Sequence, residues 1–142
     1  IGAGGFVAEI QQTSDVAYRI YDYDRQDENG NRRELHIREA AESIDYSVLP
    51  DYRTRYKQEQ DTPVMLVDCP YFITTLYETT RPRLIDYSHL DSFVILIGLK
   101  GRGTVTSGEQ TLPLCSGEIV LLPASIQRVS IEGNIKFIET HI

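Results

Sequence analysis

The chain has 142 residues, of which 41% are hydrophobic and 25% are charged, and its formal net charge is -7. This composition is typical of a folded globular protein that is long enough to bury a substantial core. The acidic balance argues against a nucleic-acid surface, because phosphate backbones are held by clustered lysines and arginines that this chain lacks.

We expect no targeting or membrane-spanning segment among these residues. The longest apolar run, residues 93–97, is too short to cross a bilayer, and residues 1–10 lack the basic start and the length of a signal peptide. The two cysteines, Cys69 and Cys115, are typical of buried reduced thiols. We therefore expect a cytoplasmic protein that binds neither a membrane nor nucleic acid.

Residues 6–24 alternate polar and apolar side chains on both sides of a short polar segment, residues 13–15. This pattern predicts a β-hairpin with a three-residue loop. In that register Glu9 lies opposite Arg19 on one face. The other face carries the apolar side chains of Phe6, Ala8, Ile10, Tyr18 and Ile20. A barrel strand with one packed face and one pocket-lining face has this division.

A polar segment, residues 26–31, predicts an exposed loop, and a helix is expected after it. The apolar positions of this helix are spaced by three and four residues: Ile37, Ala40, Ala41, Ile44 and Val48. Asn31 could cap its start, and Pro50 should end it, because proline cannot continue the hydrogen-bond ladder. Residues 51–62 mix charged residues, glutamines and tyrosines without periodicity, which predicts a connector on the surface.

From Pro63 onward the sequence predicts short strands separated by turns. The expected strands are residues 64–68, 71–77, 92–99, 104–107, 110–114, 118–122, 127–131 and 135–140. Glycine-containing turn signals separate the later strands, at residues 101–103, 107–108, 115–117 and 132–133. Many short strands with regular punctuation indicate a β-sandwich or a barrel.

Two segments of this region resemble cupin motifs. Gly117, followed by Leu122-Pro123, resembles the start of the second motif, and residues 99–105 resemble the end of the first. Where a metal-binding cupin would have a glutamate and a histidine, this chain has Val94 and Arg128, which cannot ligate a metal. His89 falls near a ligand position, but one imidazole without partners cannot hold zinc tightly. The resemblance therefore implies a metal-free jelly-roll barrel.

The amino-terminal segment closely resembles the short bacterial form of type I mannose-6-phosphate isomerase, a family of zinc-dependent cupin enzymes. The matching residues are Ala8 to Gln12, Ser14-Asp15, Tyr18-Arg19 and Tyr21-Asp22. The resemblance implies a mainly β fold, in which a cupin-type jelly-roll barrel follows a β-hairpin and one α-helix left over from an incomplete catalytic barrel. Residues 1–50 would belong to the catalytic barrel, residues 51–62 to a connector and residues 63–142 to the second barrel.

The same resemblance implies an aldose-ketose isomerase that interconverts mannose 6-phosphate and fructose 6-phosphate. The resemblance makes Arg19 the expected catalytic residue. The permanent charge and planar fork of donors of an arginine suit a substrate on which oxygen charge develops. The resemblance likewise makes Glu9 the expected substrate-binding residue, which could orient Arg19 or a sugar hydroxyl. The alternative for this pair is an exposed cross-strand ion pair without chemistry.

The zinc ligands of the family would lie outside these residues, so zinc is expected in the intact enzyme and not in this chain. We expect the isolated chain to be inactive, with the missing amino-terminal part of the enzyme as its partner and unpaired strand edges that could form a homodimer. The phosphate of a phosphosugar needs only local positive charge, which could come from Arg19, Arg25, Arg32 and Arg33. The rival hypothesis is a non-catalytic sugar-binding or regulatory cupin.

Overall fold

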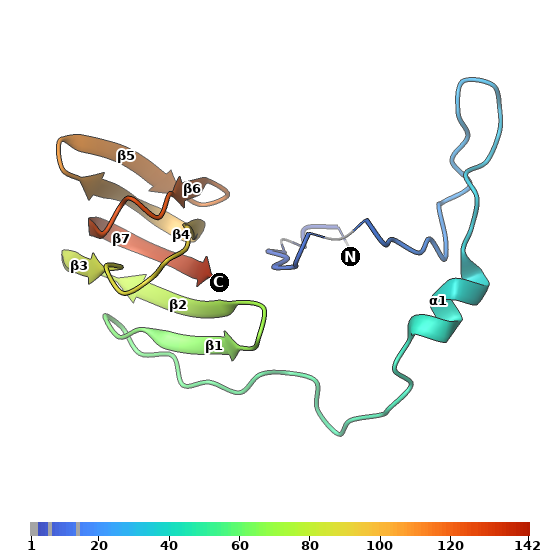
Figure 1. The fold of residues 1–142 in the computed structure, drawn as a ribbon, viewed down its shortest axis with the longest axis horizontal. Coiled ribbons are helices and arrows are strands. Elements are labelled where there is room, and N and C mark those ends of the chain that lie inside the picture. The colour runs from blue at the N-terminus through green and yellow to red at the C-terminus, as the bar shows by residue number, and fades with distance from the viewer. Residues whose placement is uncertain (1–2, 6, 14) are drawn as a thin grey trace. The chain divides into compact units, whose positions relative to one another are not determined.

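The structure is a computed structural model that describes residues 3–5, 7–13 and 15–142. These residues divide into two compact units, one within Glu9–Arg53 and the other formed by Thr54–Ile142 with residues 3–5, 7 and 8. In chain order, the helix and strands of the described residues are α1 (Ile37–Ser43), β1 (Val64–Asp68), β2 (Ile73–Thr79), β3 (Arg83–Asp86), β4 (Val94–Ser107), β5 (Gln110–Cys115), β6 (Ile119–Leu122) and β7 (Arg128–His141) (Figure 1). None of the described residues form a helix that is long and apolar enough to cross a membrane.

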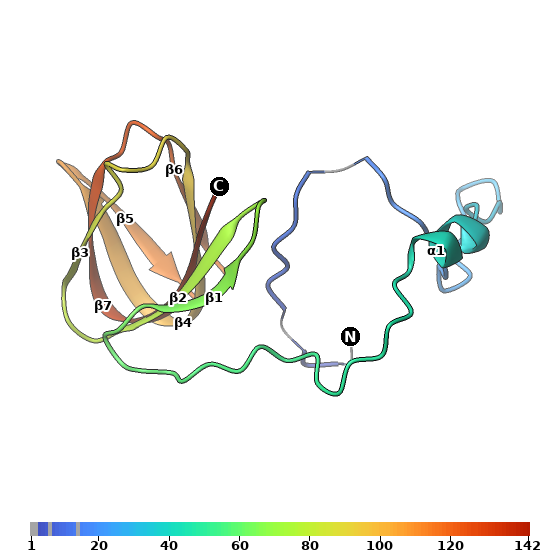
Figure 2. The same ribbon diagram turned by 60° about the horizontal axis from the view of Figure 1, so that its bottom comes forward.

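The strands form one antiparallel sheet that closes on itself, because β4 and β7 each take part in both of its halves. These two strands pair along most of their length, from Val94 opposite His141 to Thr106 opposite Ser130. One half has the order β1-β2-β7-β4-β6, and the other has the order β3-β7-β4-β5. In Figure 2 the strands surround a common interior. This arrangement confirms the predicted mainly β fold with a jelly-roll barrel after Pro63.

The core of the barrel is built mainly from alternate residues of its strands, which point into the interior between the two halves, and from Tyr87, which follows β3. Its buried members are Tyr77, Tyr87, Val94, Leu96, Val105, Leu114, Val120, Leu122, Val129, Ile131, Ile135 and Phe137. Phe137 is completely buried, and its ring stacks on Tyr77 with 4.8 Å between the ring centroids. The interior is therefore filled by side chains of the barrel itself.

Two predicted turns are wrong, because residues 101–103 lie inside β4 and residues 132–133 lie inside β7. Gly133 has a φ of 114°, and a Cβ on it would lie 2.6 Å from the carbonyl oxygen of Arg102. The glycines let the two long strands bend and pass close to each other, instead of ending them. The sequence also failed to indicate β3, a strand of four residues that includes Arg83 and Asp86 and pairs with the start of β7.

The helix is shorter than predicted. It ends at Ser43, and the next residue, Ile44, is already extended, so Pro50 does not end it. The N-cap residue is His36, which makes no side-chain capping bond, whereas Asn31 donates its backbone N–H to Asp27 Oδ1 at 2.8 Å. Ala40 is the buried residue of this helix. With so little apolar burial, packing does not support further helical turns.

The predicted hairpin is wrong for the part of the chain that the structure describes. Residues 7–13 and 15–25 contain no strand, so no ladder sets Glu9 opposite Arg19. Phe6 and Ser14, which belong to the same prediction, lie outside the described residues. Alternating side chains produce a strand only where another strand accepts the backbone hydrogen bonds. Arg19 instead bonds to Glu34 and His36, which lie beyond the following loop.

Candidate functional site

Arg19 is held by two residues that precede the helix. Its carbonyl oxygen accepts a hydrogen bond from the backbone N–H of His36 at 2.7 Å, and its own N–H donates to His36 Nδ1 at 3.2 Å. Its guanidinium donates from Nη1 to the carbonyl oxygen of Glu34 at 3.0 Å. Since Nδ1 of His36 acts as an acceptor, the ring proton must be on Nε2. These bonds close the loop of residues 19–36 and fix the position of the half-buried Arg19.

The structure does not bring Glu9 to Arg19. Glu9 is exposed in an irregular segment of the same unit, and among the described residues no ion pair joins the two side chains. The geometric basis that was predicted for this pair, a shared face of a hairpin, is therefore absent. The catalytic role of Arg19 and the substrate-binding role of Glu9 stay predictions.

A second cluster in this unit is organised by Asp22, whose surface is only 6% exposed. Its carboxylate accepts hydrogen bonds from Nε and Nη2 of Arg33, at 2.7 and 2.5 Å, and from the same two atoms of Arg25, with Nε at 3.0 Å. The bonds from Arg33, reinforced by those from Arg25, hold the pKa of Asp22 well below the usual carboxyl range despite the opposing effect of burial. The Asp22 carboxylate in turn raises the pKa of Arg33.

A tight turn brings Arg25 back onto Asp22. The backbone N–H of Arg25 donates to the carbonyl oxygen of Asp22 at 3.0 Å, and the two central residues, Tyr23 and Asp24, have φ values of 54° and 52°. Positive φ at both central positions is the geometry of a type I′ turn, and it is strained for side chains such as these. The ion pair between Asp22 and Arg25 lies across this turn and opposes its opening.

The loop that follows sets Arg33 beside Arg25. Gln26 and Arg32 form an isolated antiparallel bridge, so the next residues outward, Arg25 and Arg33, are neighbours across the chain. A shallow pocket of about 220 Å³ lies there, lined by Arg25, Gln26, Asp27 and Arg33. This cluster was not expected from the sequence, because no local pattern shows that positions 22, 25 and 33 meet.

The two residues that stand at the ligand positions of a metal-binding cupin have other roles in the barrel. Val94 belongs to the core, and Arg128 forms an ion pair with Asp86 at 3.0 Å. A buried carboxylate is present, Glu139, which accepts a hydrogen bond from the hydroxyl of Tyr87 at 2.5 Å. Burial, with a further contribution from the Glu139 charge, raises the pKa of Tyr87. Across the described ranges no group of three or more His, Cys, Asp and Glu side chains could hold a metal ion, so these residues do not fit a zinc site.

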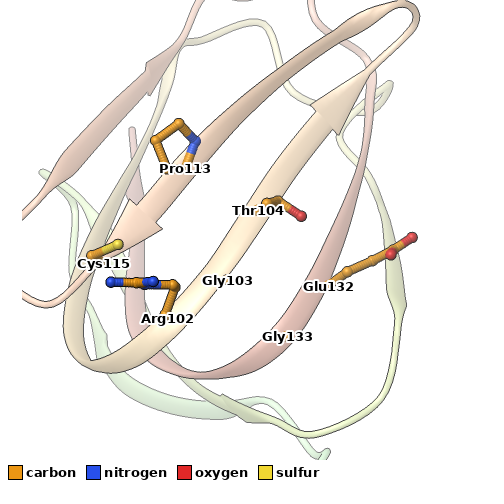
Figure 3. A pocket seen from close by; sticks show the side chains of 7 residues that line it. All are labelled: Arg102, Gly103, Thr104, Pro113, Cys115, Glu132 and Gly133. Atoms are coloured by element: carbon orange, nitrogen blue, oxygen red, sulfur yellow. The ribbon is translucent and has the colours of Figure 1, made fainter.

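The barrel also has a wide depression of about 610 Å³ on the outer surface of β4, β5 and β7. Its chemically active side chains are those of Arg102, Cys115 and Glu132. Figure 3 shows that Glu132 extends away from the other two, so the three groups do not converge on one point. None of the residues predicted to act on a substrate line this depression.

Comparison with known proteins links both units to one family. The family model described as mannose-6-phosphate isomerase, cupin domain, matches residues 62–142. The mannose-6-phosphate isomerase ManA of Bacillus subtilis is 32% identical over 144 residues, covering 100% of this chain and 45% of that protein. The mannose-6-phosphate isomerase of Streptococcus mutans is 28% identical, covering 99% of this chain and 44% of that protein. The chain thus spans less than half the length of these curated relatives.

Solved structures of mannose 6-phosphate isomerases also resemble this chain. The crystal structure of the mannose 6-phosphate isomerase from Bacillus subtilis has a TM-score of 0.70 and 28% identity, covering 91% of this chain and 41% of that chain. The apo form of the Salmonella typhimurium enzyme, at 17% identity and a TM-score of 0.60 over 78% of this chain and 28% of that chain, shows the fold alone. Because the family model matches more than half of the sequence, the chain belongs to the cupin-domain family of mannose-6-phosphate isomerases.

Proposed function

We propose that this chain is the carboxy-terminal part of a cytoplasmic type I mannose-6-phosphate isomerase, which interconverts mannose 6-phosphate and fructose 6-phosphate. The observation that carries the proposal is the 32% identity to the Bacillus subtilis enzyme over the whole chain, since it includes Glu9–Arg53 as well as the barrel. In this proposal residues 1–50 complete a catalytic cupin barrel, and residues 63–142 form a second barrel without a metal. Residues 51–62 form the connector between these two parts.

Arg19 would act on the charge that develops during isomerisation. Moving a proton between the two carbons of an aldose and a ketose passes through an enediol-like intermediate, in which negative charge grows on the substrate oxygens. A guanidinium fixed close by stabilises that charge. The bond to the carbonyl oxygen of Glu34 holds the guanidinium, and the bonds to His36 hold the backbone of Arg19. Glu9 would contact a sugar hydroxyl or orient Arg19.

In this proposal zinc is bound by the intact enzyme and not by this chain alone. Bound zinc would polarise the oxygens of the sugar. The described residues of this chain do not fit a metal site, and Val94 and Arg128 replace ligands in the second barrel. The metal would therefore be held by residues outside this chain, and the second barrel would be a non-catalytic companion.

The test compares the 142-residue chain with a polypeptide of the relatives' length that contains it. We expect turnover of mannose 6-phosphate and about one bound zinc per molecule in the longer protein, and neither in the shorter one. Turnover would be measured by coupled assay of fructose 6-phosphate, and zinc by elemental analysis. A zinc-loaded longer protein that binds sugar phosphates without turnover would contradict the proposal and favour the non-catalytic sugar-binding or regulatory cupin.

A further inference from the structure

We propose that Arg25 and Arg33 form a binding site for a phosphate monoester, in the pocket that they share with Gln26 and Asp27. This inference rests on the proposed function, because it assigns the phosphate end of the phosphosugar to these two arginines. The pocket volume of about 220 Å³ exceeds what one phosphate group needs. The guanidinium side chains are 64% and 50% exposed, so an anion can reach them from solvent.

The way in which Asp22 holds the two arginines leaves donors for a second acceptor. The carboxylate engages Nε and Nη2 of each guanidinium, and among the described residues no hydrogen bond uses Nη1 of either. Two arginines against one aspartate leave one positive charge in the cluster. Arginine forks bind phosphate oxygens well, because their donors are planar and their charge is permanent.

Two further acids near the pocket, Asp24 and Asp27, are engaged by partners other than the two arginines of the site. Arg32 and Asp24 form their own ion pair at 3.1 Å. Asp27 lines the pocket, but its Oδ1 accepts the backbone N–H groups of Asn29 and Asn31, at 2.9 and 2.8 Å. These bonds, together with one from the side-chain amide of Asn31, lower the pKa of Asp27. Asp27 therefore stays ionised and lowers the net positive charge of the pocket, but its oxygens are engaged within its own loop and not by the two guanidiniums.

The local backbone presents the site before any ligand arrives. The strained turn at Tyr23 and Asp24 and the bridge between Gln26 and Arg32 place Arg25 and Arg33 side by side, and Asp22 fixes both. Strain of this kind persists where surrounding interactions over-determine it, and it is concentrated at functional sites. A pair of arginines fixed in this way loses little side-chain freedom when it binds an anion.

The first experiment titrates the 142-residue chain at low ionic strength with inorganic phosphate, mannose 6-phosphate and mannose, using calorimetry and phosphorus NMR. We expect both phosphates to bind in competition and mannose not to bind. Arg25→Gln should weaken both affinities about tenfold, because a charge-assisted contact is lost. Arg38→Gln is the matched control, since Arg38 lies on α1, pairs with Glu42 and does not line the pocket. Equal weakening in both variants, or binding of mannose, would overturn the site.

The second experiment uses the longer isomerase and separates this inference from the proposed function. Arg25→Gln should raise the KM for mannose 6-phosphate about tenfold, with kcat falling much less, because the phosphate lies away from the reacting carbons. An unchanged KM in an active enzyme would overturn the site and leave the isomerase proposal intact. An inactive longer protein whose phosphate binding still depends on Arg25 would overturn the isomerase proposal and support the site.

Discussion

At the scale of single residues, Asp22 determines how the arginine-rich loop is arranged. Asp22 is buried, and its carboxylate accepts hydrogen bonds from the guanidiniums of Arg25 and Arg33. These two arginines lie 3 and 11 residues further along the chain. Sequence reasoning recognised Arg25, Arg32 and Arg33 as a source of positive charge. It could not show which of them would be neutralised, because that depends on the loop that returns the chain to Asp22.

The Asp22 cluster can be tested by Asp22→Asn. We expect faster amide hydrogen exchange at Arg25, since the ion pairs that close the turn are lost while the fold of the barrel is kept. Because the folded-state pKa of Asp22 is depressed, its contribution is present above the ordinary carboxyl range and is lost only as the pH falls below that range. Asp24→Asn removes one charge from an exposed pair and is the control. The same exchange rates in both variants would contradict this account.

At the scale of elements, the bounds of β1 were predicted correctly, and those of β5 differ by one residue. The glycine signals near Gly101 and Gly133 also reflected positive φ values. They could not distinguish a turn between two strands from a bend within one strand, because that depends on a partner strand far away in the sequence. The hairpin failed for a related reason, since its pattern was local and the partners of Arg19 are Glu34 and His36.

The bend in the two long strands can be tested by Gly133→Ala. A Cβ at this position would lie 2.6 Å from a backbone oxygen of β4, and the positive φ adds strain. We expect a loss of roughly 3 kcal/mol in the free energy of unfolding, measured with urea. Gly108 also has a positive φ, but no atom lies within 4 Å of the Cβ position. Gly108→Ala should therefore lower the free energy of unfolding by only about 1 kcal/mol. Equal losses would show that the strands do not approach closely at Gly133.

At the scale of the whole molecule, Asp61 ties the segment that precedes β1 to the residue that follows β2. Its carboxylate accepts hydrogen bonds from the backbone N–H of Thr80 at 2.7 Å and from the Thr80 hydroxyl at 2.8 Å. Led by the bond from the Thr80 backbone, these contacts lower the pKa of Asp61 from 3.8 to about 2. The cupin motifs and the segment from Ala8 to Asp22 were enough to predict the family and the mainly β fold. The contact between Asp61 and Thr80 could not be predicted, because it depends on tertiary structure and has no local sequence pattern.

Asp61 should contribute to the acid sensitivity of the barrel. A depressed carboxyl pKa stabilises the folded state above the ordinary value near 3.8, and this contribution is lost as the pH falls toward 2. We therefore expect Asp61→Asn to lower the melting temperature at pH 6 and to differ less from the wild type near pH 2. Glu109→Gln, an exposed change in the turn after β4, serves as the control. A pH-independent difference for Asp61→Asn would contradict this explanation.

The most direct test of the isomerase proposal measures kcat for mannose 6-phosphate in the longer enzyme that carries Arg19→Ala, with Arg38→Ala as a control that removes the same charge from the exposed face of α1. Loss of a fixed cation beside the developing oxygen charge should lower kcat at least about a hundredfold, whereas the control should keep it. A kcat for Arg19→Ala that equals the control would remove Arg19 from the mechanism and contradict the account.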